Sequence, residues 1–381
     1  MIPFSLEMPS VIQFGVGALE KLPAIAGRLG SRVLVVAGSR WFLDSPWRRR
    51  VVEALDGLVV EHLHCAAGEP SARSLAAASE SAARFAPDVL VAVGGGSVLD
   101  SAKALSALLR FPGPVERYLE GLPGAIAVPG PGIPWIAVPT TAGTGAEVTK
   151  NAVVRSEEMG VKRSMRSLHL LASAVIVDPR LTVTLPAVVT GTSGLDALTQ
   201  LVEAYVSRTT HPFVQSIVEG AFGPMLDALA GLSRNPADEA LRAQASYGAL
   251  VSGIALANAG LGAAHGFAAA VGGLFEVPHG LACAVFLPHV LAANAGVISG
   301  AIGRLVGGRA ALSGAEDPVQ WLAGEVTRLL SAYGLPLDLR GCRIPRHRIQ
   351  EIAEKSSGAS MRGNPRELSM EERIEILSRV L

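Results

Sequence analysis

Short apolar runs that each end at a turn residue constrain the first half of this 381-residue chain most strongly. They are rich in valine and isoleucine and lie at 33–36, 89–93, 135–138 and 175–177. Helical patterns lie between them, as at 71–84 and 98–109. Strands that alternate with helices form a mostly parallel sheet covered by helices. The sequence therefore predicts an α/β fold for the N-terminal half.

From about Leu185 onward, the chain changes to long helical patterns rich in Ala, Leu and Glu, without a convincing strand. Helices are predicted at 193–207, 212–232, 238–258, 261–274, 286–297, 316–333 and 367–380. A chain of this length is sufficient for two domains. We expect an α/β domain over 1–185 and an all-helical domain over 186–381.

Charge and composition argue against several classes of protein. The 33 basic and 33 acidic residues balance, and the absence of a long basic run argues against a nucleic-acid partner. Three widely spaced cysteines predict no disulfide framework and favour the cytoplasm. The N-terminus lacks a signal-peptide pattern. Glycine pairs and prolines interrupt the apolar region 247–303, so we expect buried core helices there and no membrane partner.

A glycine-rich turn follows the second predicted strand and opens a helix. Residues 93–100 read VGGGSVLD. Glycines let the backbone approach a phosphate closely, and a helix N-terminus offers free N–H groups. Ser97 can either cap the helix or donate to a phosphate. The motif is neither GxGxxG nor a P-loop, so by itself it is a weak signal.

A second loop, PTTAGTGAEV at 139–148, follows the next predicted strand. Its threonines and glycines can hydrogen-bond phosphate and ribose, although an ordinary capped turn has the same composition. Two such loops at successive strand ends favour a dinucleotide crevice.

The end of the first strand bears on the choice between NAD and NADP. Residues 37–40 read AGSR and contain no carboxylate for the adenosine ribose. Gly38 leaves room for a 2′-phosphate, which Ser39 and Arg40 could bind. A plain turn with an exposed arginine is an equally open alternative. We predict that the chain binds NADPH in preference to NADH.

Asp196 and Gln200 are four residues apart, so a helix presents both side chains on one face. His265 and His279 lie in a region rich in Ala and Gly with little other polarity. One carboxylate and two imidazoles can bind zinc or ferrous iron, whereas the amide of Gln200 is a weaker ligand.

On one straight helix, His265 and His279 would be about 21 Å apart, too far to share an ion. Gly272, Gly273 and Pro278 lie between them and can break the helix and return the chain. A shared site is therefore possible.

Four segments resemble the iron-containing (group III) alcohol dehydrogenases, in the order found in that family. They are GGGSVLDSAK at 94–103, PTTAGTGAEVT at 139–149, GLDALTQLVEAY at 194–205 and VPHG at 277–280. The resemblance covers nearly the whole chain. The wider group includes glycerol dehydrogenases, maleylacetate reductases and dehydroquinate synthases.

The resemblance implies a dinucleotide-binding α/β domain, a helical metal-binding domain and a cleft between them that holds a small alcohol or aldehyde. A homodimer is expected. The metal ligands that it implies are Asp196, His265 and His279. The cofactor residues that it implies are Gly95, Gly96, Ser97, Thr140, Thr141 and Thr144, with Asp100, Lys103 and Lys162 nearby.

Two positions depart from the family pattern. Gln200 stands where the alcohol dehydrogenases usually carry histidine, which bears on metal retention. It could add an amide oxygen to the site or hydrogen-bond a bound water. Ala269 stands where a further histidine is often found, which removes a candidate proton relay.

We expect an NAD(P)-dependent alcohol dehydrogenase or aldehyde reductase in which His265 and His279 are the catalytic residues, because they help to hold an iron or zinc ion. A metal-independent maleylacetate-type reductase is one alternative, but residues 252–290 contain no Lys or Arg for a dicarboxylate. A dehydroquinate-synthase-like lyase would also need cationic groups there. The third alternative is a non-catalytic nucleotide-binding protein.

Overall fold

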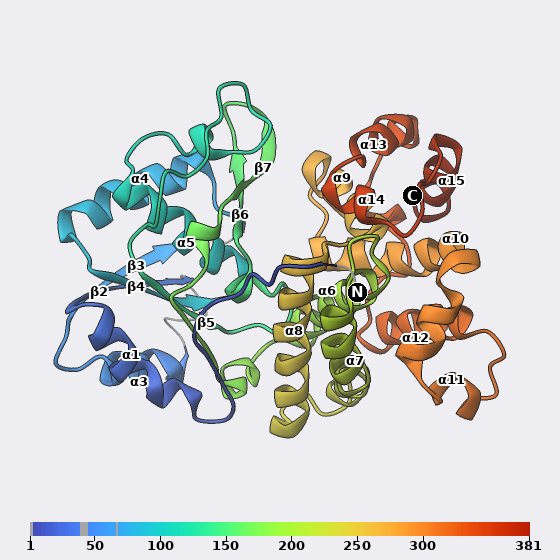
Figure 1. Ribbon diagram of the computed structural model, residues 1–381, viewed down its shortest axis with the longest axis horizontal. Helices are drawn as coiled ribbons and strands as arrows, with labels where there is room; N and C mark the ends of the chain where they lie inside the picture. Colours follow the sequence, from blue (N-terminus) through green and yellow to red (C-terminus); the bar gives the residue numbers. More distant parts are fainter. Residues whose placement is uncertain (1–2, 39–44, 66–67) are drawn as a thin grey trace. The chain divides into compact units, whose positions relative to one another are not determined.

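The computed structural model describes residues 3–38, 45–65 and 68–381 (Figure 1). The chain forms two compact units. One contains residues 7–141 and 145–182 and is an α/β unit. The other contains 142–144, 183–381 and the described part of 1–6, and it is helical.

The α/β unit is built on a six-stranded sheet with the strand order β1-β8-β5-β4-β2-β3. All five strand pairings are parallel, which confirms the predicted sheet. The strands are β1 (Ile12–Phe14), β2 (Arg32–Gly38), β3 (Val59–Cys65), β4 (Val89–Gly94), β5 (Trp135–Pro139) and β8 (Ala174–Val177).

The four strands predicted from apolar runs lie inside the sheet, and the two that were missed lie at its edges. Every residue of β4 and β5 is buried, as expected for strands covered on both faces. The edge strand β3 reads VVEHLHC and alternates in exposure, and β1 has three residues. Neither gives a strong apolar signal.

Helices cover both faces of the sheet. On one face, α1 (Leu22–Leu29) and α3 (Pro46–Ala54) pack against β2, β4 and β5. On the other face lie α4 (Ala72–Phe85) and α5 (Gly96–Arg110), close to the predicted bounds (Figure 1).

An antiparallel hairpin of β6 (Asn151–Ser156) and β7 (Val161–Arg166) was not predicted. Buried side chains attach it to α5. The Nζ of Lys103 donates to Asp100 Oδ1 (3.1 Å), Thr149 Oγ1 (2.9 Å) and the Asn151 carbonyl (2.8 Å). Asp100 Oδ2 also accepts from the backbone N–H of Val153 at 3.0 Å. Lys103 is thus satisfied as a buried cation between helix and hairpin.

The helical unit contains seven long helices among the described residues, and the sequence predicted each of them. They are α6 (Ala187–Val206), α7 (Pro212–Leu232), α8 (Glu239–Ala259), α9 (Ala263–Leu274), α10 (His279–Val306), α12 (Pro318–Ala332) and α15 (Met370–Val380). Shorter helices are α11 (Arg309–Leu312), α13 (Ile349–Lys355) and α14 (Ala359–Gly363). Short 3-10 helices occur in both units. They lie at Ala18–Lys21, Val115–Tyr118, Ala146–Val148, Leu168–Leu170, Pro179–Thr182, Arg340–Cys342 and Arg346–Arg348.

The predicted helix 286–297 is too short, because α10 runs from His279 to Val306 with Pro288 inside it. By length and composition alone α10 could cross a membrane, as could α8 and α9 if that bent pair formed one span. Most of the apolar stretch of α10 is buried within the helical unit, where α10 packs against α6, α9 and α12. This is the environment of a core helix.

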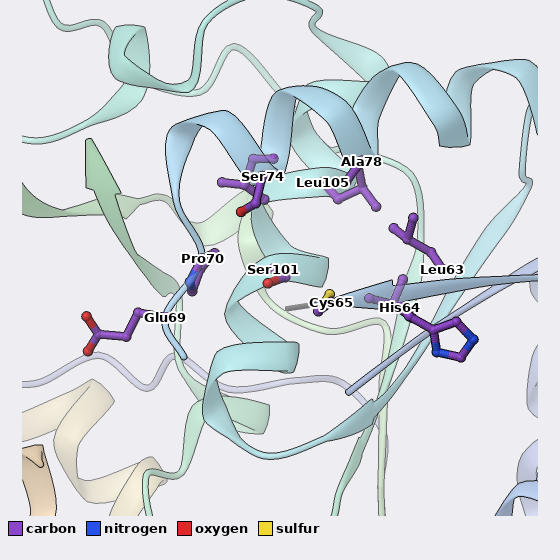
Figure 2. Close-up of a pocket in the computed structure, with 11 residues that line it drawn as sticks. Leu63, His64, Cys65, Glu69, Pro70, Ser74, Ala78, Ser101 and Leu105 are labelled. Atoms are coloured by element: carbon purple, nitrogen blue, oxygen red, sulfur yellow. The ribbon is translucent and has the colours of Figure 1, made fainter. Parts of the chain in front are cut away.

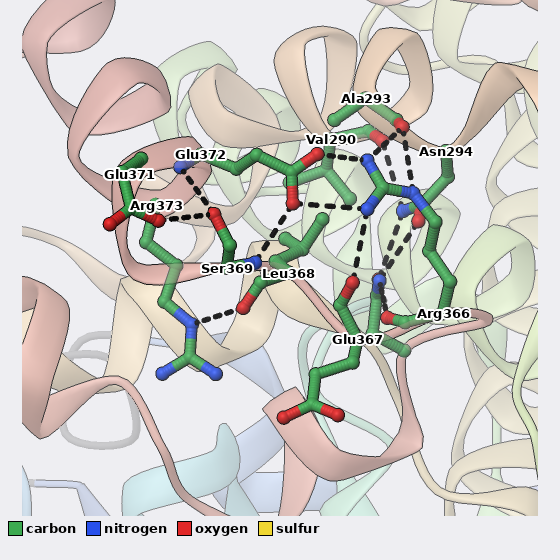
Figure 3. Close-up of polar contacts among 11 residues, drawn as sticks. Val290, Ala293, Asn294, Arg366, Glu367, Leu368, Ser369, Glu371, Glu372 and Arg373 are labelled. Atoms are coloured by element: carbon green, nitrogen blue, oxygen red, sulfur yellow. Dashed lines mark hydrogen bonds and ion pairs between the residues drawn. The ribbon is translucent and has the colours of Figure 1, made fainter.

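Polar contacts fasten the C-terminal segment to α10 (Figure 3). Arg366 donates to the Ala293 carbonyl at 2.7 Å and pairs with Glu372 at 2.5 Å. The amides of Asn294 and Asn364 bond each other in both directions. Asn364 Oδ1 also accepts from the backbone N–H of Ala263, at the start of α9. The segment therefore connects α10 to the helix that carries His265.

Candidate metal centre and cofactor loops

Asp196, His265 and His279, from three different helices, come together in the helical unit with Cys283. One donor atom from each of the four lies within 4.8 Å of all the others. Asp196 is on α6, His265 on α9, and His279 and Cys283 on α10. Three of the side chains are buried and His279 is half-buried. Helix α9 ends at Leu274 and the next one begins at His279, so the turn between them brings the two histidines to one place, as the sequence allowed.

The Asp196 carboxylate and the His265 ring face each other without an ordinary hydrogen bond. Asp196 Oδ1 and His265 Nε2 are 3.3 Å apart and buried, and neither has a hydrogen-bond partner among the described residues. Two buried lone pairs that face each other repel unless a proton or a cation lies between them. The donor set of one carboxylate and two imidazoles therefore fits a divalent metal ion.

Glu203, one turn beyond Gln200 on α6, fixes the orientation of His265. Its carboxylate accepts from His265 Nδ1 at 2.7 Å. It also accepts from the backbone N–H groups of Gly262 (3.0 Å), Ala264 (2.6 Å) and His265 (3.4 Å), at the start of α9. A carboxylate is favoured at a helix N-terminus. When Nδ1 donates to Glu203, the neutral imidazole carries its lone pair on Nε2, which faces Asp196.

The charged groups of the cluster shift one another's pKa values. Burial opposes charging of His265, but Cys283, Asp196 and Glu203 outweigh burial and raise its pKa well above the usual value. Burial also opposes ionisation of Asp196, but His265 and His279 hold its pKa below the usual value. Burial raises the pKa of the Cys283 thiol to about 12.

Gly280 allows α10 to approach α6 closely beside His279, the first residue of α10. A Cβ on Gly280 would lie 2.3 Å from the Thr192 carbonyl oxygen and 3.1 Å from the Cβ of Asp196. The ring centroids of His265 and His279 are 5.6 Å apart. A side chain at position 280 would therefore push His279 away from Asp196.

The oxygen and the nitrogen of the Gln200 amide are both hydrogen-bonded to neutral groups. Its Oε1 accepts from Ser252 Oγ at 2.8 Å, and its Nε2 donates to the Thr144 carbonyl at 3.3 Å. Gln200 is buried, on the same helix as Asp196. Its expected role as a metal ligand stays a prediction.

Gly38 and the glycine-rich turn meet where the strand order of the α/β unit reverses. From β2 the chain moves outward to β3, and from β4 it moves in the opposite direction to β5. Ligands of such sheets bind at the carboxyl ends of the strands at this switch point. Gly38 ends β2, and a Cβ there would lie 3.5 Å from a Val98 methyl group in the first turn of α5.

The glycine-rich turn at the start of α5 has no side-chain cap. The suggestion that Ser97 caps the helix is therefore wrong. Gly95 is the N-cap of α5 and makes no side-chain cap hydrogen bond, so Ser97 lies within the first turn. The first N–H groups of a helix have no partner within the helix. Gly96 and Ser97 are both partly exposed here.

The second loop lies against the first. The Thr140 N–H donates to the Gly94 carbonyl at 3.0 Å, and Gly95 approaches Thr141 so closely that a Cβ would lie 3.2 Å from its methyl group. Thr144 is exposed and groups with the helical unit. The two loops that the sequence singled out are thus neighbours at least as far as Thr141.

The other predicted cofactor residues have mixed surroundings. Asp100 is occupied by Lys103 and the hairpin. Lys162, on β7, forms an ion pair with Glu69. Ser39 and Arg40 lie outside the described residues.

A pocket lies beside the carboxyl ends of β2 and β3, between the sheet and helices α4 and α5 (Figure 2). The polar residues among those that line it are His64, Cys65, Glu69, Ser74 and Ser101. Glu69, which pairs with Lys162, is one of the lining residues.

Comparison with known proteins identifies the family. Residues 9–179 match the iron-containing alcohol dehydrogenase family, and residues 190–381 match the C-terminal part of the Fe-containing alcohol dehydrogenase family. The chain belongs to the iron-containing alcohol dehydrogenase family. It is an oxidoreductase of the alcohol/aldehyde class, in a family that uses NAD(P)H and a divalent metal.

Relatives of this dehydrogenase match over nearly their full length. It is 31% identical to long-chain-alcohol dehydrogenase 1 of Geobacillus thermodenitrificans over 362 residues, 92% of this chain and 89% of that protein. It is 28% identical to the NADPH-dependent butanol dehydrogenase of Clostridium saccharobutylicum, over 98% of this chain and 96% of the relative. The crystal structure of a 1,3-propanediol oxidoreductase superposes with a TM-score of 0.91 at 28% identity, covering all of both chains.

Two residues at the candidate metal centre of this family member were not predicted from the sequence. They are Glu203 and Cys283. Glu203 lies seven residues after Asp196, so both are on one face of α6. Cys283 lies four residues after His279 on α10. Helical spacing from the recognised ligands would have pointed to both.

Proposed function

We propose that this enzyme interconverts small alcohols and aldehydes with NADP(H), and that Asp196, His265 and His279 hold the divalent metal. The observation that carries the proposal is the facing pair of Asp196 Oδ1 and His265 Nε2, buried and 3.3 Å apart. A bound divalent ion lowers the pKa of an alcohol hydroxyl and polarises an aldehyde carbonyl.

The protein groups serve to position the reaction. Glu203 keeps His265 in the tautomer whose Nε2 can bind a cation. Gly280 lets His279 reach the same place. Gln200 either adds its amide oxygen to the metal or hydrogen-bonds a water there. These residues raise the rate by holding the ion where the substrate oxygen can reach it.

For the cofactor, we propose that the pyrophosphate binds at the N-terminus of α5, at Gly95, Gly96 and Ser97. The first turn of α5, which has no side-chain cap, and its place at the strand-order reversal support this. Thr140, Thr141 and Thr144 contribute from the second loop, and Asp100 and Lys162 lie to the side. Gly38, Ser39 and Arg40 receive the 2′-phosphate of NADP(H).

The substrate is proposed to be small and weakly polar. The helix segments around the two histidines consist mainly of buried Ala, Phe and Leu, without Lys or Arg between 252 and 290. Such surroundings do not neutralise the charges of a dicarboxylate or a phosphorylated sugar acid.

The test measures oxidation of NADPH with a panel of small aldehydes, before and after removal and restoration of the metal. We expect activity to disappear when a chelator strips the ion and to return with zinc or ferrous iron. Full activity in verified metal-free protein would overturn the metal-assisted reaction. A lower kcat/KM with NADPH than with NADH would overturn the cofactor preference alone.

We also propose a cytoplasmic homodimer without a nucleic-acid or membrane partner. The three cysteines are free, which fits a reducing compartment. Large apolar side chains are exposed along the N-terminal segment and the edge strand β1, where a second copy can cover them. They are Phe4, Leu6, Met8, Val11, Phe14 and Val16. Light scattering that gives the mass of a monomer at micromolar concentration would contradict the dimer.

A further inference from the structure

We propose that Cys283 is a fourth protein ligand of the metal, bound as a thiolate. The inference rests on the proposed metal centre and specifies its composition as Asp196, His265, His279 and Cys283. It would make the site a mixed oxygen, nitrogen and sulfur site.

Cys283 is placed for this role by the helix that also carries His279. Residues four apart on a helix lie on the same face, one turn apart, so their side chains can reach one ion. The Sγ of Cys283 and the Nε2 of His279 are 3.6 Å apart. Cys283 is completely buried, and its sulfur atom belongs to the same cluster as the Asp196 and His265 donors.

Two separations between donor atoms match those of a tetrahedral zinc site, and all four donors lie within 4.8 Å of one another. Zinc binds sulfur at about 2.3 Å and nitrogen or oxygen at about 2.0–2.1 Å. At a tetrahedral angle these lengths place sulfur and nitrogen about 3.6 Å apart, and nitrogen and oxygen about 3.3 Å apart. The observed separations are 3.6 Å for Cys283 Sγ to His279 Nε2 and 3.3 Å for His265 Nε2 to Asp196 Oδ1.

The contacts of Gln200 support the same assignment. Its amide oxygen accepts from Ser252, and its nitrogen donates to Thr144, so both ends have neutral partners. Cys283 offers a stronger ligand, because a thiolate carries the negative charge that a divalent ion requires. The ligand set then has two anionic groups, Asp196 and Cys283, which balance a charge of +2.

A thiolate ligand changes the metal preference. Soft sulfur ligands favour zinc over harder ions, so we expect this enzyme to bind zinc more tightly than ferrous iron. With four protein ligands in place, a substrate oxygen would have to bind zinc as a fifth ligand.

The experiment compares the cobalt-substituted protein with Cys283→Ser and Cys342→Ser variants. Thiolate bound to cobalt gives a charge-transfer band in the near ultraviolet. We expect this band in the wild type and in Cys342→Ser, whose cysteine lies outside the cluster, and we expect its loss in Cys283→Ser. Competition with a chromophoric chelator should show zinc affinity at least about 10-fold weaker in Cys283→Ser.

X-ray absorption of the zinc-loaded wild type supplies a readout that needs no variant. One sulfur neighbour at about 2.3 Å is expected. A first shell of oxygen and nitrogen alone, or a band that persists in Cys283→Ser, overturns the role of Cys283 and leaves the metal-dependent function standing. A wild type that binds no ion and keeps full activity overturns the proposed metal centre as well.

Discussion

Glu203 and His265 are joined by a hydrogen bond of 2.7 Å between the carboxylate and Nδ1, while the same carboxylate accepts from the backbone at the start of α9. Helix α9 and the imidazole are therefore oriented by one group. A change at Glu203 should affect both the fold of α9 and the affinity for the metal.

Replacement of Glu203 by glutamine should weaken metal binding by about 10- to 100-fold, as is usual when the partner of a ligand histidine is altered. The amide keeps the shape of the carboxylate but offers N–H groups where N–H donors already point. Metal affinity can be measured by chelator competition. Glu239→Gln is a suitable control, because Glu239 is exposed in the first turn of α8. Equal affinity in the two variants would contradict the role of Glu203.

Gly280→Ala should reduce metal occupancy and activity together. The new Cβ would lie 2.3 Å from the Thr192 carbonyl, a backbone atom that cannot move without shifting α6. Gly296→Ala tests the same substitution on the same helix where a Cβ meets nothing within 4 Å. That control should be neutral or more stable by up to about 1 kcal/mol. Metal content by elemental analysis and thermal melting would distinguish the two sites.

Gln200→His should tighten metal binding, because imidazole is a better ligand than a neutral amide. The substitution removes the contacts to Ser252 and Thr144, so the variant also requires a check of its melting temperature. Zinc affinity measured at fixed pH decides the matter. Unchanged affinity in a folded variant would place Gln200 outside the ligand sphere.

The Gln200→His substitution allows a second comparison. If Cys283 supplies the fourth ligand, Gln200→His introduced into Cys283→Ser should restore much of the lost zinc affinity. Restoration without the near-ultraviolet cobalt band would show that the two positions supply alternative donors to one ion.

Glu147 gives a pH dependence that is independent of the metal centre. Burial raises its pKa from 4.5 to about 7, although Lys103 opposes the shift. The folded protein thus binds this proton more tightly than the unfolded chain does. The stabilising contribution is complete below about pH 4.5 and is lost as the pH rises through about 7, by roughly 3 kcal/mol in total.

Glu147→Gln should therefore melt at a higher temperature than the wild type at about pH 8, with a smaller difference at about pH 5. Glu158→Gln, at an exposed position in the β6–β7 turn, is the matched control. A difference in melting temperature that does not change between these pH values would contradict the raised pKa of Glu147.

The sequence predicted the strands that consist of uninterrupted apolar residues. The strands β2, β4, β5 and β8 are apolar runs because helices cover both faces of the sheet. The hairpin β6–β7 was missed because β7 reads VKRSMR and has little apolar character. Its attachment depends on the buried Lys103, which no local pattern reveals.

The sequence pointed to those residues of the cluster that lie at positions matching the metal ligands of the family. The structure brings Asp196, His265 and His279 together, and their approach depends on the close contact at Gly280, which sequence spacing does not show. Cys283 was set aside because cysteines were considered as a disulfide set, although its spacing from His279 on α10 places both on one face. Helical spacing places Glu203 on the same face of α6 as Asp196, but its contact with the start of α9 follows from the packing of the two helices.

The four clustered donors come from three helices that are far apart in the chain. An ion bound there would act as a non-covalent cross-link among α6, α9 and α10, and its binding free energy would add to the folding free energy of the helical unit. The supply of metal would then set how long the polypeptide survives in the cell as well as how fast it turns over. Protein made under metal starvation would be the first to be degraded, with its helical unit opening before the α/β unit.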